Sequence, residues 1–427
     1  MHLIELQNFI QATRDSGYQS ATEAIAEIVD NSIEANASVV HINFNYVKES
    51  KGYNISVMDN GHGMTPKGLT NAIRFGGTDR FNSRKKFGRY GMGLPNSSLS
   101  QSKRLEVYTW RKKPNYYWNY LDVDEVVSGR LKEINQSKKV KIPDEFIDMA
   151  QESGTLVLWN KIDRFSIKYL SPYLKKLNQS LGQIFRQSLY KGLKIKINGV
   201  QMRPFDPLYL KSGTNAIGAE LYGRTMKVPI RLKKRISNVE LRFSELPVIK
   251  WSPYSNKEKR IMRITKNAGV SILRNGREID YGWFFMGKKR KENYDDWWRC
   301  EISFNPELDD LFGITHTKQM VNPTNELQEI LQPHVESVAH RLNNRVREKF
   351  IFLNKIKNKG EAILMAQVND HLIEPLQEKL KYNVDNMDFD SGEGRFNGYQ
   401  YTVTQRPLNS SVLYDNKLQE DTINIEL

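Results

Sequence analysis

The sequence has one cysteine, no long apolar run, and no basic segment leading into an apolar stretch at its start. The single thiol, Cys300, excludes an internal disulfide, and its apolar and aromatic neighbours predict a buried side chain. A membrane-spanning helix needs about 18 consecutive apolar residues, so no membrane association is expected. The N-terminal stretch MHLIELQNFIQATRDSGYQS does not resemble a secretory signal. These absences favour a reducing, cytoplasmic setting.

Acidic residues are also in short supply. The chain has 64 Lys and Arg against 49 Asp and Glu, a net charge of +15. Residues 80–141 hold fifteen Lys or Arg and five Asp or Glu, and basic runs follow at 231–235 and 288–291. Such an excess favours polyanionic partners, nucleic acid first. The alternative is a highly soluble surface without such a partner, and part of the charge could serve nucleotide phosphates.

At 427 residues the chain is too long for one simple core, and two or three domains are expected. Residues 1–20 read as an extended arm before a helix that Ser20 or Thr22 could cap. Alternating strands, among them 116–126, short helices and an amphipathic helix at 170–190 follow. Turns are expected at Asn198-Gly199 and Asn275-Gly276, Pro204 to Pro207 mark a boundary, and a helix is expected to begin near Asn325. The predicted units are 1–205, a strand-rich domain at 206–345, a helical extension at 346–385 and a polar tail at 386–427.

The helix EAIAEIVDNSIE, residues 23–34, carries the first functional pattern. Glu27 and Asn31 are four residues apart and therefore lie on one helix face. Apolar residues occupy another face, where they can dock on a core. A carboxylate beside an amide oxygen suits the binding of Mg²⁺ and the orientation of a water molecule. An ordinary amphipathic helix with a solvated polar face is the alternative.

Three later segments fit the same site. In the turn DNGHGM, Asp59 can accept a hydrogen bond from an exocyclic amine, while Gly61 and Gly63 let the backbone approach a flat base. The segment KFGRYGMGLPNSSLS at 86–100 is a glycine-rich entry to a helix, which can present N–H groups to phosphates. Thr155, in ESGTLVLW, begins a strand where its hydroxyl could reach the base through water.

The order ExxxDN, DNGxGM, GxxGxG and SGT resembles the GHKL ATPase superfamily, which includes gyrase B, the ninety-kilodalton chaperone, MutL and the Microrchidia (MORC) proteins. The resemblance covers residues 20–200 and, more weakly, 208–345. Each motif alone is weak, but the four together in this order are specific. It implies an α+β chain: a Bergerat-type α/β sandwich with a mixed sheet covered by helices, then a transducer-like α/β domain and the helical extension.

The resemblance also implies roles for the site residues. Glu27 is the general base that activates water, Asn31 is a ligand of Mg²⁺, and Asp30 supports the site indirectly through hydrogen bonds. Asp59 binds the adenine amine, with Gly61, Gly63 and Met64 beside the base, and Thr155 joins the water network there. The lid that wraps the phosphates contains Gly88, Gly91, Gly93 and Leu94. The implied cofactors are ATP and Mg²⁺, and slow ATP hydrolysis is the expected reaction.

The second domain carries GITHTKQMVNP at 313–323, which resembles a transducer loop of Microrchidia type. The resemblance implies that Lys318 contacts the γ-phosphate, beside Gln319. A lysine that pairs only with ATP would distinguish nucleotide states, as a switch requires. The alternative is a surface lysine in a loop.

Other branches of the superfamily are not supported. The chain has no phosphoacceptor histidine with a following Glu-Leu-Arg, no metal-nuclease motif and no toprim cluster, and one cysteine excludes a CW-type zinc finger.

The leading hypothesis is therefore an ATP-dependent homodimer that acts as a DNA clamp without sequence preference, in a setting such as antiviral or genome defence. The alternatives are a chaperone-like ATPase, with Trp251, Trp283, Trp297 and Trp298 as a client surface, and a nucleotide sensor that recruits a separate effector protein. Core positions are the simpler interpretation of those tryptophans.

Overall fold

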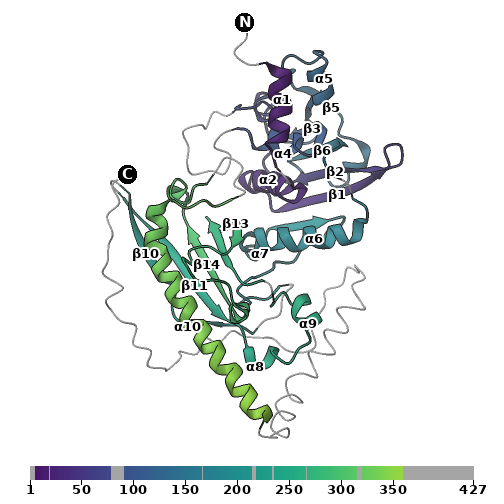
Figure 1. The fold of residues 1–427 in the computed structure, drawn as a ribbon. Helices are drawn as coiled ribbons and strands as arrows, with labels where there is room; N and C mark the ends of the chain where they lie inside the picture. The colour runs from purple at the N-terminus through teal and green to yellow at the C-terminus, as the bar shows by residue number, and fades with distance from the viewer. Residues whose placement is uncertain are drawn as a thin grey trace.

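The structure is a computed structural model that describes residues 5–18, 20–77, 91–165, 167–213, 218–232, 235–265, 267–314 and 320–358. Figure 1 shows two units stacked along the long axis, with a long helix beside the second. The predicted α+β architecture is confirmed: a mixed sheet covered by helices is followed by a second sheet and a C-terminal helix.

The first sheet has eight strands in the order β5-β4-β3-β6-β2-β1-β7-β8. Its neighbours pair antiparallel except for β1 and β7, which are parallel. The strands are β1 (Val39–Val47), β2 (Gly52–Asp59), β3 (Ser102–Trp110), β4 (Tyr116–Asp122), β5 (Lys138–Val140), β6 (Gly154–Ile162), β7 (Lys194–Ile197) and β8 (Val200–Gln201). The hairpin predicted at Asn198-Gly199 is present, with positive φ at both residues.

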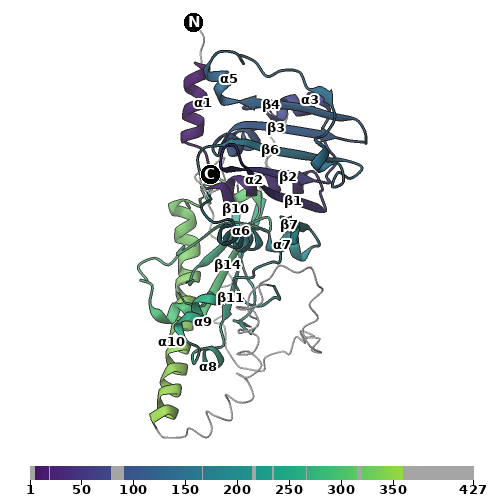
Figure 2. The same cartoon turned by 90° about the vertical axis from the view of Figure 1, so that its right-hand side faces the viewer.

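Helices pack on one face of this sheet (Figure 2). Period-2 alternation turns apolar residues of the strands toward them, and Ile25, Ile28 and Val29 complete that core. The helices are α1 (Leu6–Asp15), α2 (Ala21–Glu34), α3 (Pro66–Ala72), α4 (Gly93–Leu99), α5 (Val123–Val127), α6 (Leu170–Ile184) and α7 (Arg186–Tyr190).

Three local expectations need correction. The predicted arm contains the helix α1, which buries Ile10 and Arg14; the guanidinium of Arg14 donates to the carbonyl of Leu99 and pairs with Asp163. The strand expected at 116–126 stops at Asp122, whose carboxylate caps α5. The helix expected at 170–190 divides at Phe185, whose ring is buried.

The second sheet has the order β10-β11-β14-β12-β13, with β9 paired to β11. Its strands are β9 (Glu220–Leu221), β10 (Met226–Leu232), β11 (Arg235–Glu245), β12 (Val270–Arg274), β13 (Arg277–Gly282) and β14 (Trp298–Phe304). The short helices α8 (Val248–Trp251) and α9 (Asn256–Ile261) and the 3-10 turns η1 (Asp144–Phe146), η2 (Asn293–Trp297) and η3 (Pro306–Leu308) complete the fold. Cys300 is buried on β14 as expected, and burial raises the pKa of its thiol.

The helix α10 (Asn325–Asn358) begins where the sequence predicts and runs through the expected boundary at 345 without a break. Apolar residues three and four apart, from Leu327 to Leu342, pack on the second sheet. Beyond them, Arg345 and Lys349 pair with Glu245 of β11. The rest of the expected helical extension and the polar tail lie outside the described residues.

A buried polar network joins the two units. The guanidinium of Arg186, at the start of α7, has no exposed surface and donates to Glu278 at 2.7 Å, to Ser271 at 2.7 Å and to Glu301 at 2.8 Å. Gln183 of α6 also donates to Glu278, at 2.7 Å. Burial opposes the charged form of Arg186, but the two carboxylates outweigh it and raise its pKa.

Candidate functional site

The helix α2 places Glu27 and Asn31 one turn apart, as the sequence predicts. Ser20 begins the helix as its cap, because its hydroxyl accepts a hydrogen bond from the Glu23 N–H at 3.2 Å. Glu27 is 2% exposed, whereas Asn31 is half-buried. The carboxylate therefore lies inside the fold, and the amide lies closer to solvent.

Gly93, the first residue of α4, lies directly against the Glu27 carboxylate. A Cβ atom at Gly93 would stand 2.1 Å from Oε1 of Glu27, well inside contact distance. The two motifs that the sequence separates are thus in contact, and a side chain at Gly93 would have to displace the carboxylate. Leu94 packs on the first core, and the carbonyl of Gly91 accepts a hydrogen bond from the Gly76 N–H at 3.1 Å. Gly88 lies outside the described residues.

Asp59 ends β2 with its carboxylate fixed by three donors. Ser32 Oγ donates to Oδ2 at 2.9 Å, the Gly61 N–H donates to Oδ1 at 2.8 Å, and the Thr155 backbone N–H adds a third bond. Burial raises the pKa of Asp59, and these donors only partly offset that effect. Ser32 was not among the predicted site residues, although it follows Asn31 directly in sequence.

The glycines of the turn have a packing role. A Cβ at Gly61 would lie 2.6 Å from Cβ of Ala35, and one at Gly63 would lie 2.1 Å from the carbonyl oxygen of Trp110. Gly63 also has a φ of +64°, which side-chain-bearing residues rarely adopt. Close approach to protein atoms therefore explains both glycines without reference to a bound adenine base.

Thr155 and Met64 meet at a residue that the sequence analysis missed. Thr109 Oγ1 donates to the Gly154 carbonyl at 3.2 Å, accepts from the Met64 N–H at 2.9 Å, and lies 3.1 Å from Thr155 Oγ1. A hydroxyl has one hydrogen, so the Thr155 hydroxyl donates to Thr109 and keeps its lone pairs for another donor. The sequence signal that could have identified Thr109 is its position on the inward face of β3.

Three further groups surround Glu27. Asp30 Oδ2 forms an ion pair with Arg277 Nε of β13 at 2.8 Å. Burial and the nearby Glu27 carboxylate raise the pKa of Tyr18, while the positive charge of Arg277 opposes this rise. Tyr18, Glu27, Asp30 and Arg277 thus form one electrostatic cluster, which we name the Asp30 cluster. No sequence pattern pointed to Tyr18 or Arg277.

Lys318 and Gln319 lie outside the described residues, but the chain on both sides of their loop is held. The Asn322 N–H donates to the Phe312 carbonyl at 3.0 Å, and the Val321 N–H donates to Asp280 Oδ2 of β13 at 2.9 Å. Gly313 has a φ of +62°, and a Cβ there would collide with the Asn322 carbonyl. Val321 is therefore held on the strand that also carries Arg277.

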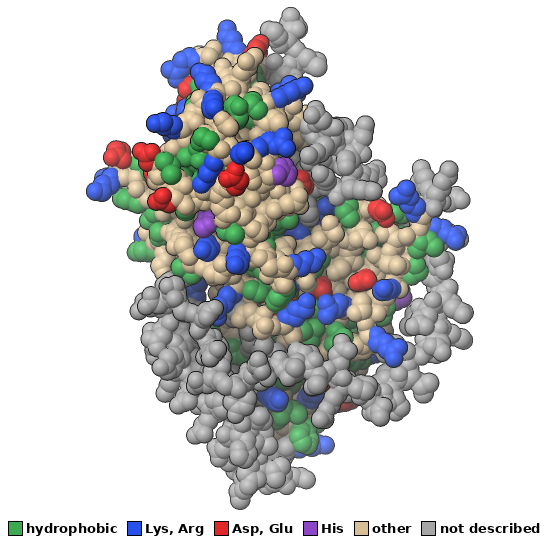
Figure 3. Space-filling model, turned by 180° about the vertical axis from the view of Figure 1, so that it is seen from behind, with side chains coloured by type: hydrophobic (Ala, Val, Ile, Leu, Met, Phe, Trp, Pro, Cys, Tyr) green, Lys and Arg blue, Asp and Glu red, His purple; other side chains and the backbone are tan. Residues whose placement is uncertain are grey.

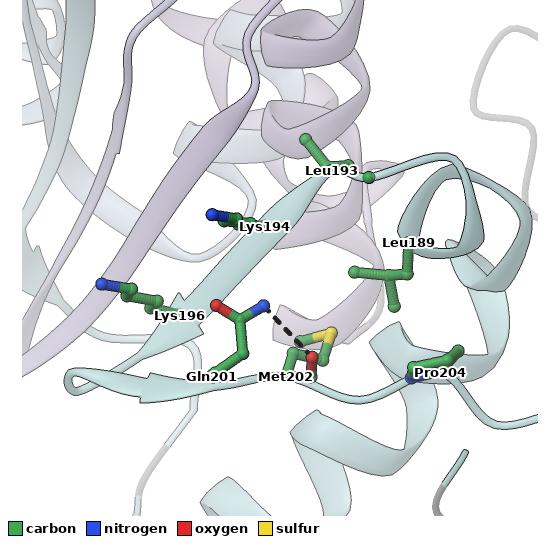
Figure 4. A pocket seen from close by; sticks show the side chains of 8 residues that line it. Leu189, Leu193, Lys194, Lys196, Gln201, Met202 and Pro204 are labelled. Atoms are coloured by element: carbon green, nitrogen blue, oxygen red, sulfur yellow. Dashed lines mark hydrogen bonds between the residues drawn. The ribbon is translucent and has the colours of Figure 1, made fainter. Parts of the chain in front are cut away.

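A separate hollow lies at the edge of the first sheet that β7 and β8 form (Figure 4). Lys194 and Lys196 of β7 and Gln201 of β8 line it, together with Leu189 and other apolar groups. Gln201 Nε2 donates to the Met202 carbonyl at 3.3 Å across its floor. None of the predicted site residues contributes to this hollow, so it is distinct from the site on α2.

Basic side chains outnumber acidic ones on the face shown in Figure 3, and they spread over both units. Exposed members of the basic stretch 80–141 include Arg111, Lys112, Lys138, Lys139 and Lys141. Lys289, from the run 288–291, is instead buried in an ion pair with Asp295 at 2.7 Å. It is therefore unavailable to a polyanion, and residues 233–234 of the other run lie outside the described residues.

The first unit carries the predicted site residues on α2, β2, α4 and β6, and part of it matches a known family of ATPases. Residues 18–155 match the family model described as "Histidine kinase-, DNA gyrase B-, and HSP90-like ATPase". The predicted resemblance to GHKL ATPases is thereby confirmed over residues 18–155.

A stretch of 97 residues is 34% identical to "ATPase MORC2B" of Mus musculus, which supports the Microrchidia-like character. The match covers 22% of this chain and 9% of the mouse protein, so the two share only a small part of the relative's length. Among the described ranges, no helix is both long and apolar enough to cross a membrane.

Proposed function

We propose that the chain binds ATP with Mg²⁺ and hydrolyses it slowly, with Glu27 as the general base. The observation that carries this proposal is the contact of Glu27 with Gly93. This contact places the buried Glu27 carboxylate at the start of α4. On α2 the carboxylate shares a helix face with Asn31. A carboxylate can accept the proton of an attacking water, and an amide oxygen suits Mg²⁺. Glu27 and Asn31 therefore suit a site that holds ATP and Mg²⁺.

The remaining residues are proposed to hold the nucleotide. Asp59 accepts from the adenine amine, and Thr155 accepts from a water at the base with its remaining lone pairs. Gly88, Gly91, Gly93 and Leu94 form the lid, and its closure limits turnover. When bound, Mg²⁺ neutralises phosphate charge. Lys318 is proposed to contact the γ-phosphate, so Lys318→Ala should lower turnover.

We further propose that ATP closes a homodimer around DNA, in a cytoplasmic genome-defence setting with a separate effector protein. The charge of +15 and the exposed basic residues support binding to phosphates without base reading. The chaperone alternative lacks such support, because Trp251, Trp297 and Trp298 are buried and Trp283 is half-buried. Of these four tryptophans only Trp283 keeps part of its surface exposed, so they do not form a continuous apolar surface for a client.

Light scattering and DNA retention test the clamp. With a non-hydrolysable ATP analogue, the mass should double, and a closed circular plasmid should be retained more firmly than a linear fragment that can slide free. Retention should weaken steeply with salt, because counterions are released on binding. Turnover that DNA does not change, without any retention of plasmid, would rule out the clamp and favour a nucleotide sensor.

Gly93→Ala is expected to reduce ATP turnover. The new Cβ would stand 2.1 Å from Glu27 Oε1 and must displace the carboxylate. A displacement of about 1 Å can cost about a hundredfold in rate. Phosphate release measures the effect, and Gly52→Ala on the β1–β2 hairpin is the control, since its nearest atom would be 3.5 Å away. Unchanged turnover in Gly93→Ala would contradict the contact.

Asp59→Asn is expected to weaken ATP binding by about 1.5–3 kcal/mol, the range for a hydrogen bond to a charged group. In the native protein, burial raises the pKa of Asp59, so the carboxylate takes up its proton at a higher pH than an ordinary aspartate. ATP affinity should therefore fall as the pH is lowered toward that raised pKa. Calorimetric titration across pH checks this, and the Asp59→Asn variant should lose this part of the pH dependence.

A further inference from the structure

We propose that Arg277, supplied by the second domain, is a positioning residue of the ATPase site. Through Asp30 it fixes the helix α2 and hence the Glu27 carboxylate. This inference rests on the proposed ATPase function. It adds that the site is incomplete without β13, so that hydrolysis requires the second sheet to be docked on the first domain.

The geometry of Arg277 carries the proposal. Its Nε lies 2.8 Å from Asp30 Oδ2, and the two side chains are 10% and 2% exposed. Its Nη1 donates to the Glu278 carbonyl at 3.2 Å, and its guanidinium carbon lies 5.9 Å from the centre of the Phe185 ring. A buried pair with several fixed partners holds both of its residues in place far better than a surface pair does.

Asp30 transmits this constraint because it lies within one turn of both Glu27 and Asn31 on α2. The Tyr18 hydroxyl is influenced by Glu27, Asp30 and Arg277 together, which places all four groups in one cluster. A shift of β13 would therefore move Asp30 and the carboxylate that packs on Gly93.

The strand β13 is itself fixed to the first domain. Its next residue, Glu278, accepts hydrogen bonds from Arg186 and Gln183, which belong to α7 and α6. Arg277 thus stands beside the anchor of the domain interface. The same strand holds the Val321 end of the Lys318 loop through Asp280. One strand therefore connects the interface, the Asp30 cluster and Val321.

The test compares Arg277→Gln with Arg274→Gln. Arg274 ends the other strand of the same hairpin and is also buried, with 5% of its side chain exposed, but its partner Asp309 belongs to the second domain. Both variants lose a buried arginine–aspartate pair. Only Arg277→Gln should lower kcat, by about tenfold to a hundredfold, since about 1 Å of misplacement has that effect. KM for ATP should stay within about threefold, and Arg277→Lys should recover most of the rate.

A second measurement does not depend on turnover. Hydrogen exchange of the amides of β12 and β13 should slow when a non-hydrolysable ATP analogue binds the wild-type protein and Arg274→Gln, but not Arg277→Gln. If Arg277→Gln fails to fold, Asp30→Asn interrupts the same pair from the other side and should give the same kcat loss and the same exchange result.

The outcomes separate the two proposals. A wild-type protein that hydrolyses ATP, with equal kcat in the Arg274 and Arg277 variants, would overturn the role of Arg277 alone. Equal losses in both variants would likewise assign Arg277 to stability and overturn its positioning role. A wild-type protein that neither binds nor hydrolyses ATP would overturn the proposed function, and the positioning role with it.

Discussion

Replacing Glu27 by alanine should abolish ATP hydrolysis while ATP binding persists. A positioned general base contributes about 10²–10⁴-fold to a rate, and Glu27 is the carboxylate in contact with the glycine at the start of α4. Binding should persist because Asp59 lies on another element, at the end of β2, and the substitution leaves its donors Ser32 and Gly61 in place. Single-turnover phosphate release and titration with a fluorescent ATP analogue measure the two effects separately.

Glu23→Ala is the matched control, since Glu23 lies on the same helix and is only half-buried. It should leave the rate nearly unchanged. Glu27→Gln is a useful companion because it keeps the side-chain volume against Gly93 and removes only the basic group. An equal loss of binding and turnover in both Glu27 variants would contradict the assignment of Glu27 as the base.

Arg186→Met should produce the largest loss of stability in the chain. The substitution keeps the apolar stem but leaves Glu278 and Glu301 buried without the guanidinium that binds both. Breaking a buried ion pair from one side costs about 3–5 kcal/mol. Urea denaturation of the two domains measures the effect, and Arg104→Met, in a partly exposed cluster with Glu106 and Asp122, should cost clearly less.

A rescue experiment identifies the cause. Adding Glu278→Gln and Glu301→Gln to Arg186→Met removes the stranded charges and should recover part of the stability. A stability deficit that the two added substitutions do not reduce would point to lost packing instead.

Local patterns in the sequence were sufficient to predict most of the elements. Alternating residues identified the strands of the first sheet, and the Asn-Gly pairs at 198–199 and 275–276 adopt the left-handed turns that such pairs favour. The predicted elements were wrong where a contact with a residue distant in sequence determines the secondary structure. The helix α1 is stabilised by Arg14 reaching Asp163, and the break at Phe185 frees Arg186 to enter the domain interface.

The candidate site shows the same limit. The spacing of Glu27 and Asn31 on a helix was predictable, because both belong to one local pattern. Thr109 and Arg277 were not, since each acts on residues distant in sequence: Thr109 on Met64 and Thr155, Arg277 on Asp30. Only the folded topology brings such pairs together. The roles of the site residues themselves remain predictions that the experiments above address.

The helix α10 has a consequence for whatever the chain acts upon. Its 34 residues correspond to a rod about 50 Å long, which runs along the second sheet and away from the first domain (Figure 1). Its C-terminal end is therefore far from the domain that carries the candidate ATP site. A partner bound at that end would be displaced when the helix tilts relative to the first domain. Because the helix is long, a small tilt at the domain junction would move its far end several times further than its near end.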